Sequence, residues 1–359
     1  MSADAGAKPR PRLKAKPRPR PIQDPTAPNA EAERLRHSLP RAGWTVVAAK
    51  EFGDHLLSAR FTVLLVILGF AATIPMYFAA DQIRSLAPQA TGVPAIFLAL
   101  FTVGSPDIGI LRVDYFVGLV APLLGLAFAF DAVNGERSEG TLPRLLAQPI
   151  HRDDVINGKF AAGMASIGTV IVSVVTFIAA FGILRLGIVP HGDEILRLVA
   201  WVLATFLYVA IWLAFGLLLS VLIRRAATAA LVGFGVWFVV AALGDFFARL
   251  LAGLITPAAS TFDAIAGAAR IQQLIARLFP GTLYAEVSKA ILDPTTNAKD
   301  VIIPSTLGQY DQASQQVSSV LGLGQSLLLV WPQIVVMVAL TVVCFAAAYV
   351  AFMRQEVRA

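Results

Sequence analysis

The pair Gly158-Lys159 would end a phosphate-binding loop if the residues around it also fitted that motif. A P-loop needs a glycine before the pair at the G-x-x-x-x-G spacing and a serine or threonine after it, because backbone N–H groups and a hydroxyl together hold the phosphates and Mg²⁺. The sequence has Asp153 and Phe160 at those positions. We therefore expect no ATP to bind through a P-loop of this chain.

The histidines and the cysteine show no spacing that suits a metal or a nucleophile. The four histidines are scattered along the chain, and none forms an HExxH or a Cys/His pattern. A GxSxG motif is absent. The single cysteine, Cys344, lies in an apolar run, so no disulfide can form within the chain. We predict no catalytic residue, no cofactor and no metal site.

Residues 134–159 are a charged island between two long apolar runs, at 115–133 and 160–184. Each run has roughly 20 residues, which is enough for a helix to cross a bilayer. The island therefore connects two spans and is expected to lie at a membrane surface.

A short helix is expected inside this island. Leu142, Leu145 and Leu146 fall on one face of it, at i, i+3 and i+4. Thr141 is placed to cap its start, and Pro149 follows its end. A helix with three leucines on one face needs an apolar groove to cover them.

The island also has a specific pattern of residues. In chain order these residues are Glu136, Arg137, Glu139, Gly140, Thr141, Leu142, Leu145, Leu146, Pro149, Arg152, Gly158 and Lys159. The pattern resembles the coupling loop of ABC-2 type exporter permeases, which in that family docks onto a separate ATPase subunit. Ala147 departs from it, since many members have serine there. The resemblance implies an ATPase-coupling role for Glu136, Glu139, Gly140, Thr141, Leu142, Leu145, Leu146, Pro149 and Arg152. The residues alone are equally consistent with an alternative, a surface helix that lies on lipid headgroups.

Composition indicates an integral membrane protein, because 57% of the residues are hydrophobic, 14% are charged and the mean hydropathy is +0.71. The runs long enough to span are 61–80, 115–133, 160–184, 198–223, 226–244 (which could extend further) and 326–352. They lack the period-two alternation of a membrane β-barrel. The predicted fold is therefore all-α with six transmembrane helices, five within residues 61–256 and the sixth within residues 326–359.

Two further segments precede the first span. Residues 1–42 form a basic, proline-rich cytoplasmic tail, expected to be disordered because proline excludes helix and like charges repel. This tail could attract anionic lipid or simply be solvated, and no folded module accompanies its charge to suggest a nucleic acid. Residues 43–60 place Ala48, Phe52 and Leu56 on one side, which predicts an amphipathic helix in the plane of the interface. It resembles the elbow helix that opens ABC-2 permeases.

Residues 257–325 are expected to form a small helical segment outside the cytoplasm. An i, i+3, i+4, i+7 apolar pattern from Ile271 predicts one helix, which Pro280 breaks. Thr282 is placed to cap a second helix that Asp293 ends. A linker with surface helices is the alternative.

Orientation follows from lysine and arginine in the short loops. With both termini cytoplasmic, the inner side holds the basic tail, Arg137 and the pair Arg224-Arg225. Trp201 and Trp331 then fall where an outer interfacial belt would lie. We therefore expect a multi-pass protein of the cytoplasmic membrane with both ends inside.

The resemblance implies the permease subunit of an ABC-2 type export system, which is not an enzyme itself because its partner hydrolyses ATP. The implied partners are a cytoplasmic ABC ATPase subunit, a second permease subunit in a homodimer or heterodimer, and membrane lipid. One alternative is an ion-coupled secondary transporter, but this needs acidic groups near the midplane, and Asp245 is better placed to pair with Arg249. The other is a non-transporting membrane anchor for an ATPase.

Overall fold

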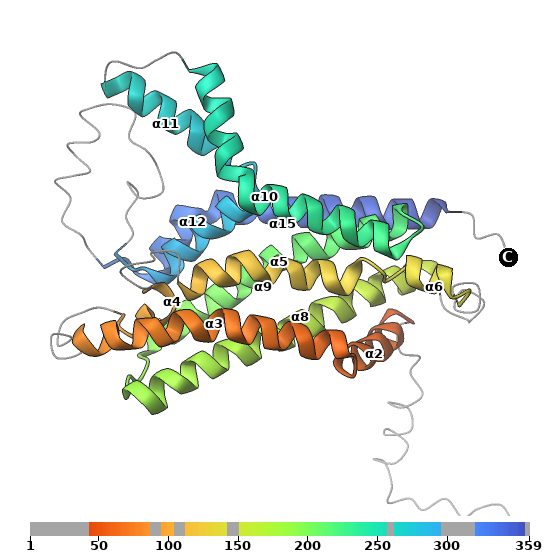
Figure 1. The fold of residues 1–359 in the computed structure, drawn as a ribbon, viewed down its shortest axis with the longest axis horizontal. Helices are drawn as coiled ribbons and strands as arrows, with labels where there is room; N and C mark the ends of the chain where they lie inside the picture. The colour runs from red at the N-terminus through yellow and green to blue at the C-terminus, as the bar shows by residue number, and fades with distance from the viewer. Residues whose placement is uncertain are drawn as a thin grey trace, which may run out of the picture. The chain divides into compact units, whose positions relative to one another are not determined.

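The computed structural model describes residues 43–86, 95–103, 112–141, 151–256, 262–295 and 320–355, and all regular structure within them is α-helical. The helices of Figure 1 are α2 (Gly43–Leu56), α3 (Ala59–Leu86), α4 (Ala99–Thr102), α5 (Val113–Ala129), α6 (Asn134–Ser138), α8 (Arg152–Leu186), α9 (Gly192–Leu222), α10 (Ala226–Ile255), α11 (Phe262–Ala276), α12 (Pro280–Leu292) and α15 (Leu323–Arg354). The all-α prediction is confirmed for these residues. The predicted tail, residues 1–42, lies outside them.

Five stretches of helix are long and apolar enough to cross a membrane: Ala59–Tyr77, Val113–Ser138, Arg152–Leu186, Gly192–Leu222 and Leu323–Arg354. A sixth is counted if α10, which bends by 59° between Ala241 and Phe246, crosses as one span. Each predicted apolar run overlaps one of these stretches or α10. The fifth run extends beyond residue 244, since α10 continues to Ile255.

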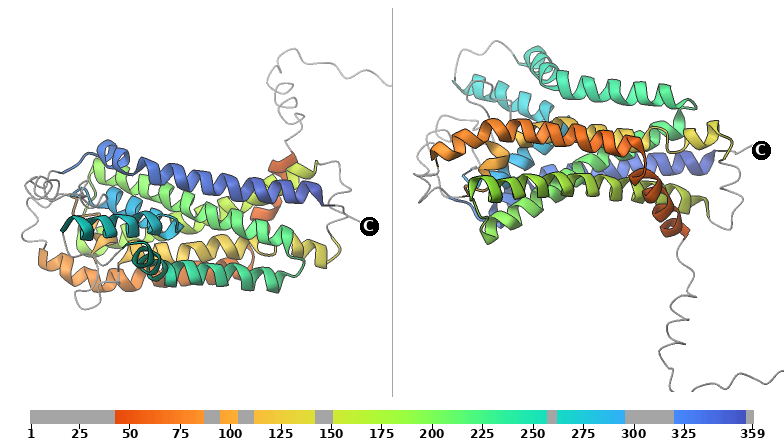
Figure 2. Two further views of the ribbon diagram at one scale, coloured as in Figure 1. Left: turned by 90° about the horizontal axis from the view of Figure 1, so that it is seen from above. Right: turned by 60° about the horizontal axis from the view of Figure 1, so that its bottom comes forward.

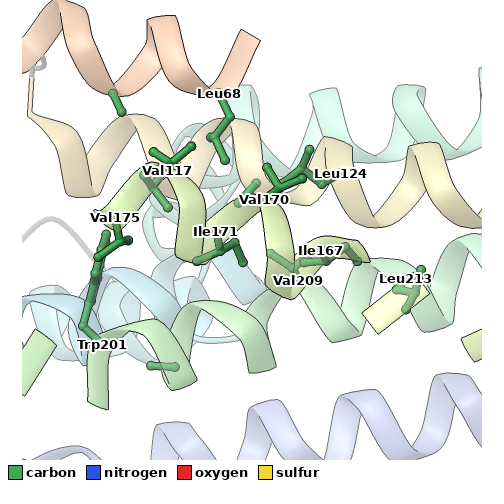
Figure 3. Packing of buried hydrophobic residues seen from close by; sticks show 14 of the residues in the cluster. Leu68, Val117, Leu124, Ile167, Val170, Ile171, Val175, Trp201, Val209 and Leu213 are labelled. Carbon is green, nitrogen blue, oxygen red and sulfur yellow. The ribbon is translucent and has the colours of Figure 1, made fainter. Parts of the chain in front are cut away.

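The long helices run side by side, and α9 packs against α5, α8, α12 and α15 (Figures 1 and 2). Its approach to α5 is close, because a Cβ at Gly125 would lie 2.8 Å from backbone atoms of Val209 and Leu213. In membrane proteins, small residues allow two helices to pack this closely. Buried side chains form a large cluster between the helices. The cluster residues labelled in Figure 3 come from α3, α5, α8 and α9: Leu68, Val117, Leu124, Ile167, Val170, Ile171, Val175, Trp201, Val209 and Leu213.

One end of the bundle, called here the α12 end, is fastened by the buried Arg197 of α9. Its guanidinium donates to the carboxylate of Asp193 at 2.8 Å, to the carbonyl of Ile291 in α12 at 2.9 Å and to the carbonyl of Leu321 before α15. The neighbouring Glu194 accepts a hydrogen bond from the backbone N–H of Phe97 at 2.8 Å. These bonds connect α9 to α12, to the start of α15 and to the turn before α4.

Two sequence-based expectations for the α12 end are wrong. Trp201 is fully buried, and its Nε1 donates to Ser288 Oγ at 2.7 Å, so it belongs to the helix packing and not to an interfacial belt. The second helix of residues 257–325 begins at Pro280 and contains Thr282, because proline suits the first turn of a helix, where its missing N–H is not needed. That helix packs on α9 and α15 instead of forming a loose linker.

Candidate functional site

The opposite end of the bundle, called here the α6 end, carries the residues on both sides of loop 142–150, which itself lies outside the described residues. Its central feature is Lys159, in the second turn of α8, whose side chain is only 3% exposed. Its Nζ lies 2.7 Å from Glu136 Oε1 of α6 and 3.2 Å from Glu51 Oε1 of α2. A buried ammonium is costly unless carboxylates pair with it. This ion pair therefore fixes α2, α6 and α8 relative to one another.

The same ion pair joins the chain before the loop to the chain after it, and Gln355 makes a second junction. Arg137 Nη2 donates to Gln355 Oε1, and Arg152 Nη1 donates to the backbone carbonyl of Gln355 at 3.3 Å. The Gln355 amide in turn donates to the Val221 carbonyl at 2.7 Å. The base of the loop is thus attached to the ends of α9 and α15 as well.

The turn between α5 and α6 is held from inside the bundle. The backbone N–H groups of Val133 and Asn134 donate to Ser220 Oγ at 3.0 and 3.2 Å. The side-chain amide of Asn134 donates to the Ile223 carbonyl at 3.1 Å. Because buried N–H groups need partners, Ser220 satisfies the donors that the break between the two helices would leave open.

Helix α2 crosses α8 at a glycine. A Cβ at Gly158 would lie 2.6 Å from Val47 Cβ and 2.9 Å from the carbonyl oxygen of Trp44, so only glycine fits. Asp154 strengthens this crossing, since its carboxylate accepts from the Trp44 N–H at 3.0 Å and from the His151 N–H at 3.2 Å. One carboxylate therefore caps the start of α8 and holds the start of α2.

A further ion pair connects α3 to the end of α5. Arg60 binds Asp131 through two hydrogen bonds of 2.9 and 2.6 Å, and it also donates to the Ala127 carbonyl at 2.9 Å. His55 of α2 is nearby in the packing, where its Nδ1 lies 3.1 Å from Ser166 Oγ. Burial lowers the pKa of His55, which favours the neutral ring.

The residues predicted to couple to an ATPase divide into three groups. Glu139, Gly140 and Thr141 are exposed after α6, where Gly140 has a φ of +68° and ends the helix in the left-handed conformation that glycine adopts readily. Glu136 and Arg152 instead face the network at the base of the loop. The remaining predicted residues lie outside the described part of the chain: Leu142, Leu145, Leu146 and Pro149.

Thr141 makes its described bonds to the preceding helix. Its N–H and its hydroxyl donate to the Glu136 carbonyl at 3.0 and 3.2 Å. The expected role of Thr141 as the cap of a following helix falls on the undescribed loop and stays a prediction.

Sequence reasoning missed the supporting residues Glu51, Asn134, Ser220 and Gln355. Ser220 lies in an apolar run, and Gln355 follows another, where polar side chains stand out. Glu136, Arg137, Arg152 and Lys159 were singled out beforehand as motif positions, and Lys159 had no contact assigned to it. Its pairing depends on the packing of helices far apart in sequence, which a local pattern does not reveal.

Comparison with known proteins gives two matches. The model of a family described as ABC-2 family transporter protein matches residues 45–357. A curated relative from Stutzerimonas stutzeri, "Probable ABC transporter permease protein NosY", is 27% identical over 209 residues. That match covers 54% of this chain and 64% of the relative.

We expect Gly158→Ala to destabilise the crossing of α2 and α8 by about 1–3 kcal/mol, since a methyl group there overlaps Val47. The matched control is Gly53→Ala in α2, where a Cβ meets nothing within 4 Å. This control should be neutral or gain roughly 0.5–1 kcal/mol from helix propensity. Thermal unfolding midpoints of the two purified variants in one detergent measure the difference. Equal midpoints would contradict the close approach of the helices.

Lys159→Met should cost about 3–5 kcal/mol of stability, because it leaves the carboxylates of Glu51 and Glu136 buried without their ammonium. Adding Glu136→Gln should recover part of the loss, since one of the two charges is then removed. Lys50→Met is the control: Lys50 also lies near Glu51, at 3.6 Å, but is 67% exposed, and its loss should cost at most about 1 kcal/mol. Thermal midpoints that do not separate Lys159→Met from Lys50→Met would refute the central ion pair.

Proposed function

The chain belongs to the ABC-2 family of transporter proteins, and from that premise we propose that it is the permease subunit of an export system in the cytoplasmic membrane. A separate ATP-binding cassette subunit supplies the energy. The observation that carries the proposal is the network around Lys159 and Gln355, which attaches both sides of loop 142–150 to the helices of the bundle.

The loop is the proposed contact with the ATPase. Its leucines 142, 145 and 146 have the spacing that predicts one face of a short helix, and burying each would stabilise a contact by about 1.5–3 kcal/mol. The exposed Glu139 and Thr141 form part of the polar rim at the start of the loop. This combination of an apolar centre and a polar rim is typical of protein interfaces.

The base of the loop explains how movement of the ATPase would reach the membrane helices. Lys159 lies in α8, Glu136 in α6, Glu51 in α2, and Gln355 follows α15. A displacement of the loop therefore acts on several helices together, because the buried ion pair cannot open without a large cost in free energy. In this proposal the permease does not hydrolyse ATP.

Partners follow from the same proposal. The curated relative is called a probable ABC transporter permease protein, and we extend that role to this chain. By the resemblance of the loop, two permease subunits, identical or different, pair in the membrane above two ATPase subunits. Lipid surrounds the apolar outer faces, and both termini are placed in the cytoplasm with the α6 end.

An ion-coupled carrier is less well supported by the charges of the described residues. Asp114 is bound by Arg112 through bonds of 3.0 and 2.5 Å, and Asp131 is bound by Arg60. Both acids lie at the ends of α5, outside its middle. The side chain of Asp245, proposed to pair with Arg249, lies outside the described residues. A non-transporting anchor would share the docking loop, and a transport assay with the assembled complex separates it from an exporter.

Leu145→Asp should prevent the ATPase subunit from co-purifying with the chain, or abolish ATPase stimulation, because an unpaired charge in an apolar contact is expensive. The chain itself should still accumulate in the membrane, since no span depends on this side chain. Without the ATPase subunit, the purified chain should show no ATP turnover.

Leu57→Asp is the matched control for that substitution. Leu57 is 90% exposed between α2 and α3, so the same charge is added outside the loop. Co-purification should be normal for this control. If Leu145→Asp also binds the ATPase normally and supports normal activity, the loop is not the coupling contact.

The orientation is tested by single cysteines in a Cys344→Ala background. Glu139→Cys is at the α6 end, and His191→Cys, whose side chain is 85% exposed, is at the α12 end. In intact cells a membrane-impermeant maleimide should label His191→Cys alone, and after permeabilisation it should label both. The reverse pattern would place the loop outside and remove the ATPase contact from the proposal.

A further inference from the structure

A cleft of about 440 Å³ lies between α5, α9, α10 and α12, away from the loop network. Its volume is in the range of small-molecule binding sites. Along α5 it extends from Arg112 to Leu119, which is about 10 Å, and along α12 from Gly281 to Lys289, which is about 12 Å. The acyl chain of a membrane lipid crosses one leaflet, half of a hydrocarbon core of about 30 Å, and would overrun this length. The cleft therefore suits a compact molecule.

Aromatic rings and glycines form the deeper part of the cleft. The rings of Tyr208 and Tyr284, which are both buried, stack at 4.5 Å between centroids with an interplanar angle of 11°. Gly118 makes room for this stack, because a Cβ there would lie 3.0 Å from Tyr284 Cε1. Phe279 lies against Gly244 in the same way, with its ring 3.4–3.7 Å from where a Cβ would be. Rings that lie beside glycines leave flat surfaces, on which another ring system packs well.

The charged groups of the wall already have partners within the chain. Arg112 donates to the Asp114 carboxylate from Nε at 3.0 Å and from Nη2 at 2.5 Å. Lys289 also has an interaction of its own within the chain. A charged ligand would lose its hydration in the cleft without gaining an unpaired counter-charge. We therefore expect the occupant to be uncharged.

Thr282, in the first turn of α12, supplies a hydrogen-bonding group to the wall. Its N–H donates to the Phe279 carbonyl at 3.1 Å. Its hydroxyl makes no hydrogen bond to any residue that the structure describes. Because a hydroxyl can both donate and accept, it suits a ligand that has an alcohol or a carbonyl group.

We propose that this cleft binds an uncharged ring compound with a hydroxyl or carbonyl group, its rings between Tyr208 and Phe279 and its polar group at Thr282. Ala241 of α10 and Ala285 of α12 are exposed parts of the wall, so the cleft opens between these two helices and the ligand enters there. The site is a property of this chain alone and does not depend on the ATPase coupling proposed above. Loss of loop function would therefore leave it intact.

The test uses the full chain in phosphatidylcholine nanodiscs and three photoactivatable benzophenones of similar size. These are the neutral 4-(hydroxymethyl)benzophenone, the anion 4-benzoylbenzoate and the cation 4-(aminomethyl)benzophenone. Peptides crosslinked by the neutral probe, identified by mass spectrometry, should contain Tyr208, Tyr284 or Phe279. The two charged probes should label the cleft about tenfold more weakly, because their hydration is lost without compensation. Diphenylmethanol should displace the neutral probe, and the single-chain alcohol hexadecanol should not.

Two variants place an indole in the cleft from different helices, Ala241→Trp in α10 and Ala285→Trp in α12. Each should reduce labelling by the neutral probe about tenfold or more, equivalent to about 1.4 kcal/mol of binding free energy. Val239→Trp is the control, because Val239 is exposed on α10 and is not part of the cleft wall. Diphenylmethanol should raise the thermal unfolding midpoint of the wild type and of this control, but not of the two filled variants, since a ligand stabilises the folded state that it binds.

Thr282→Val removes the hydroxyl and nearly keeps the shape of the side chain. It should weaken binding of diphenylmethanol about two- to tenfold, as expected for one hydrogen bond. Displacement of the neutral probe by diphenylmethane, which has no polar group, should be the same in this variant as in the wild type.

Labelling that both tryptophan variants leave unchanged would overturn the site. Equal labelling by either charged probe would overturn the uncharged class of ligand, and displacement by hexadecanol would overturn the ring compound. If a tryptophan variant does not accumulate, Thr282→Val decides: equal binding of diphenylmethanol by this variant and the wild type would refute the proposed contact.

Discussion

The buried ammonium of Lys159 is the constraint on which the α6 end depends. A cation that is almost inaccessible to solvent must be paired, and its two carboxylates come from α2 and α6. Gly158, one residue earlier, lets α2 come close enough for Glu51 to reach it. Two adjacent residues therefore provide both the close approach of the helices and the charge that selects their register.

Both ends of the bundle are held by a buried cation, but the groups that bind the cation differ. At the α12 end the buried cation is Arg197, whose planar guanidinium binds one carboxylate and two backbone carbonyls from separate segments. At the α6 end the buried cation is a lysine, whose compact ammonium suits two carboxylate oxygens that converge on one point. Between these ends the helices meet through apolar side chains and through glycines such as Gly125.

The sequence predicted the helices well and their mutual contacts poorly. Runs of about 20 apolar residues identify membrane helices because a bilayer requires that length. Hydropathy does not show which helices contact one another. Trp201 was therefore assigned to the membrane interface, although its Nε1 donates to Ser288 inside the bundle. Of the residues predicted to couple to an ATPase, Glu136 and Arg152 lie at the base of the loop, and the coupling role of all of them, the leucines included, stays a prediction.

The position of Gln355 has a consequence for the order in which the molecule is assembled. A ribosome adds this residue after every one of its partners, so Arg137, Arg152 and Val221 cannot make their bonds to Gln355 until α15 has been synthesised. The loop base can reach its final form only when the last described helix is in place. A partner that recognises this finished form would distinguish a fully inserted chain from a truncated or stalled one.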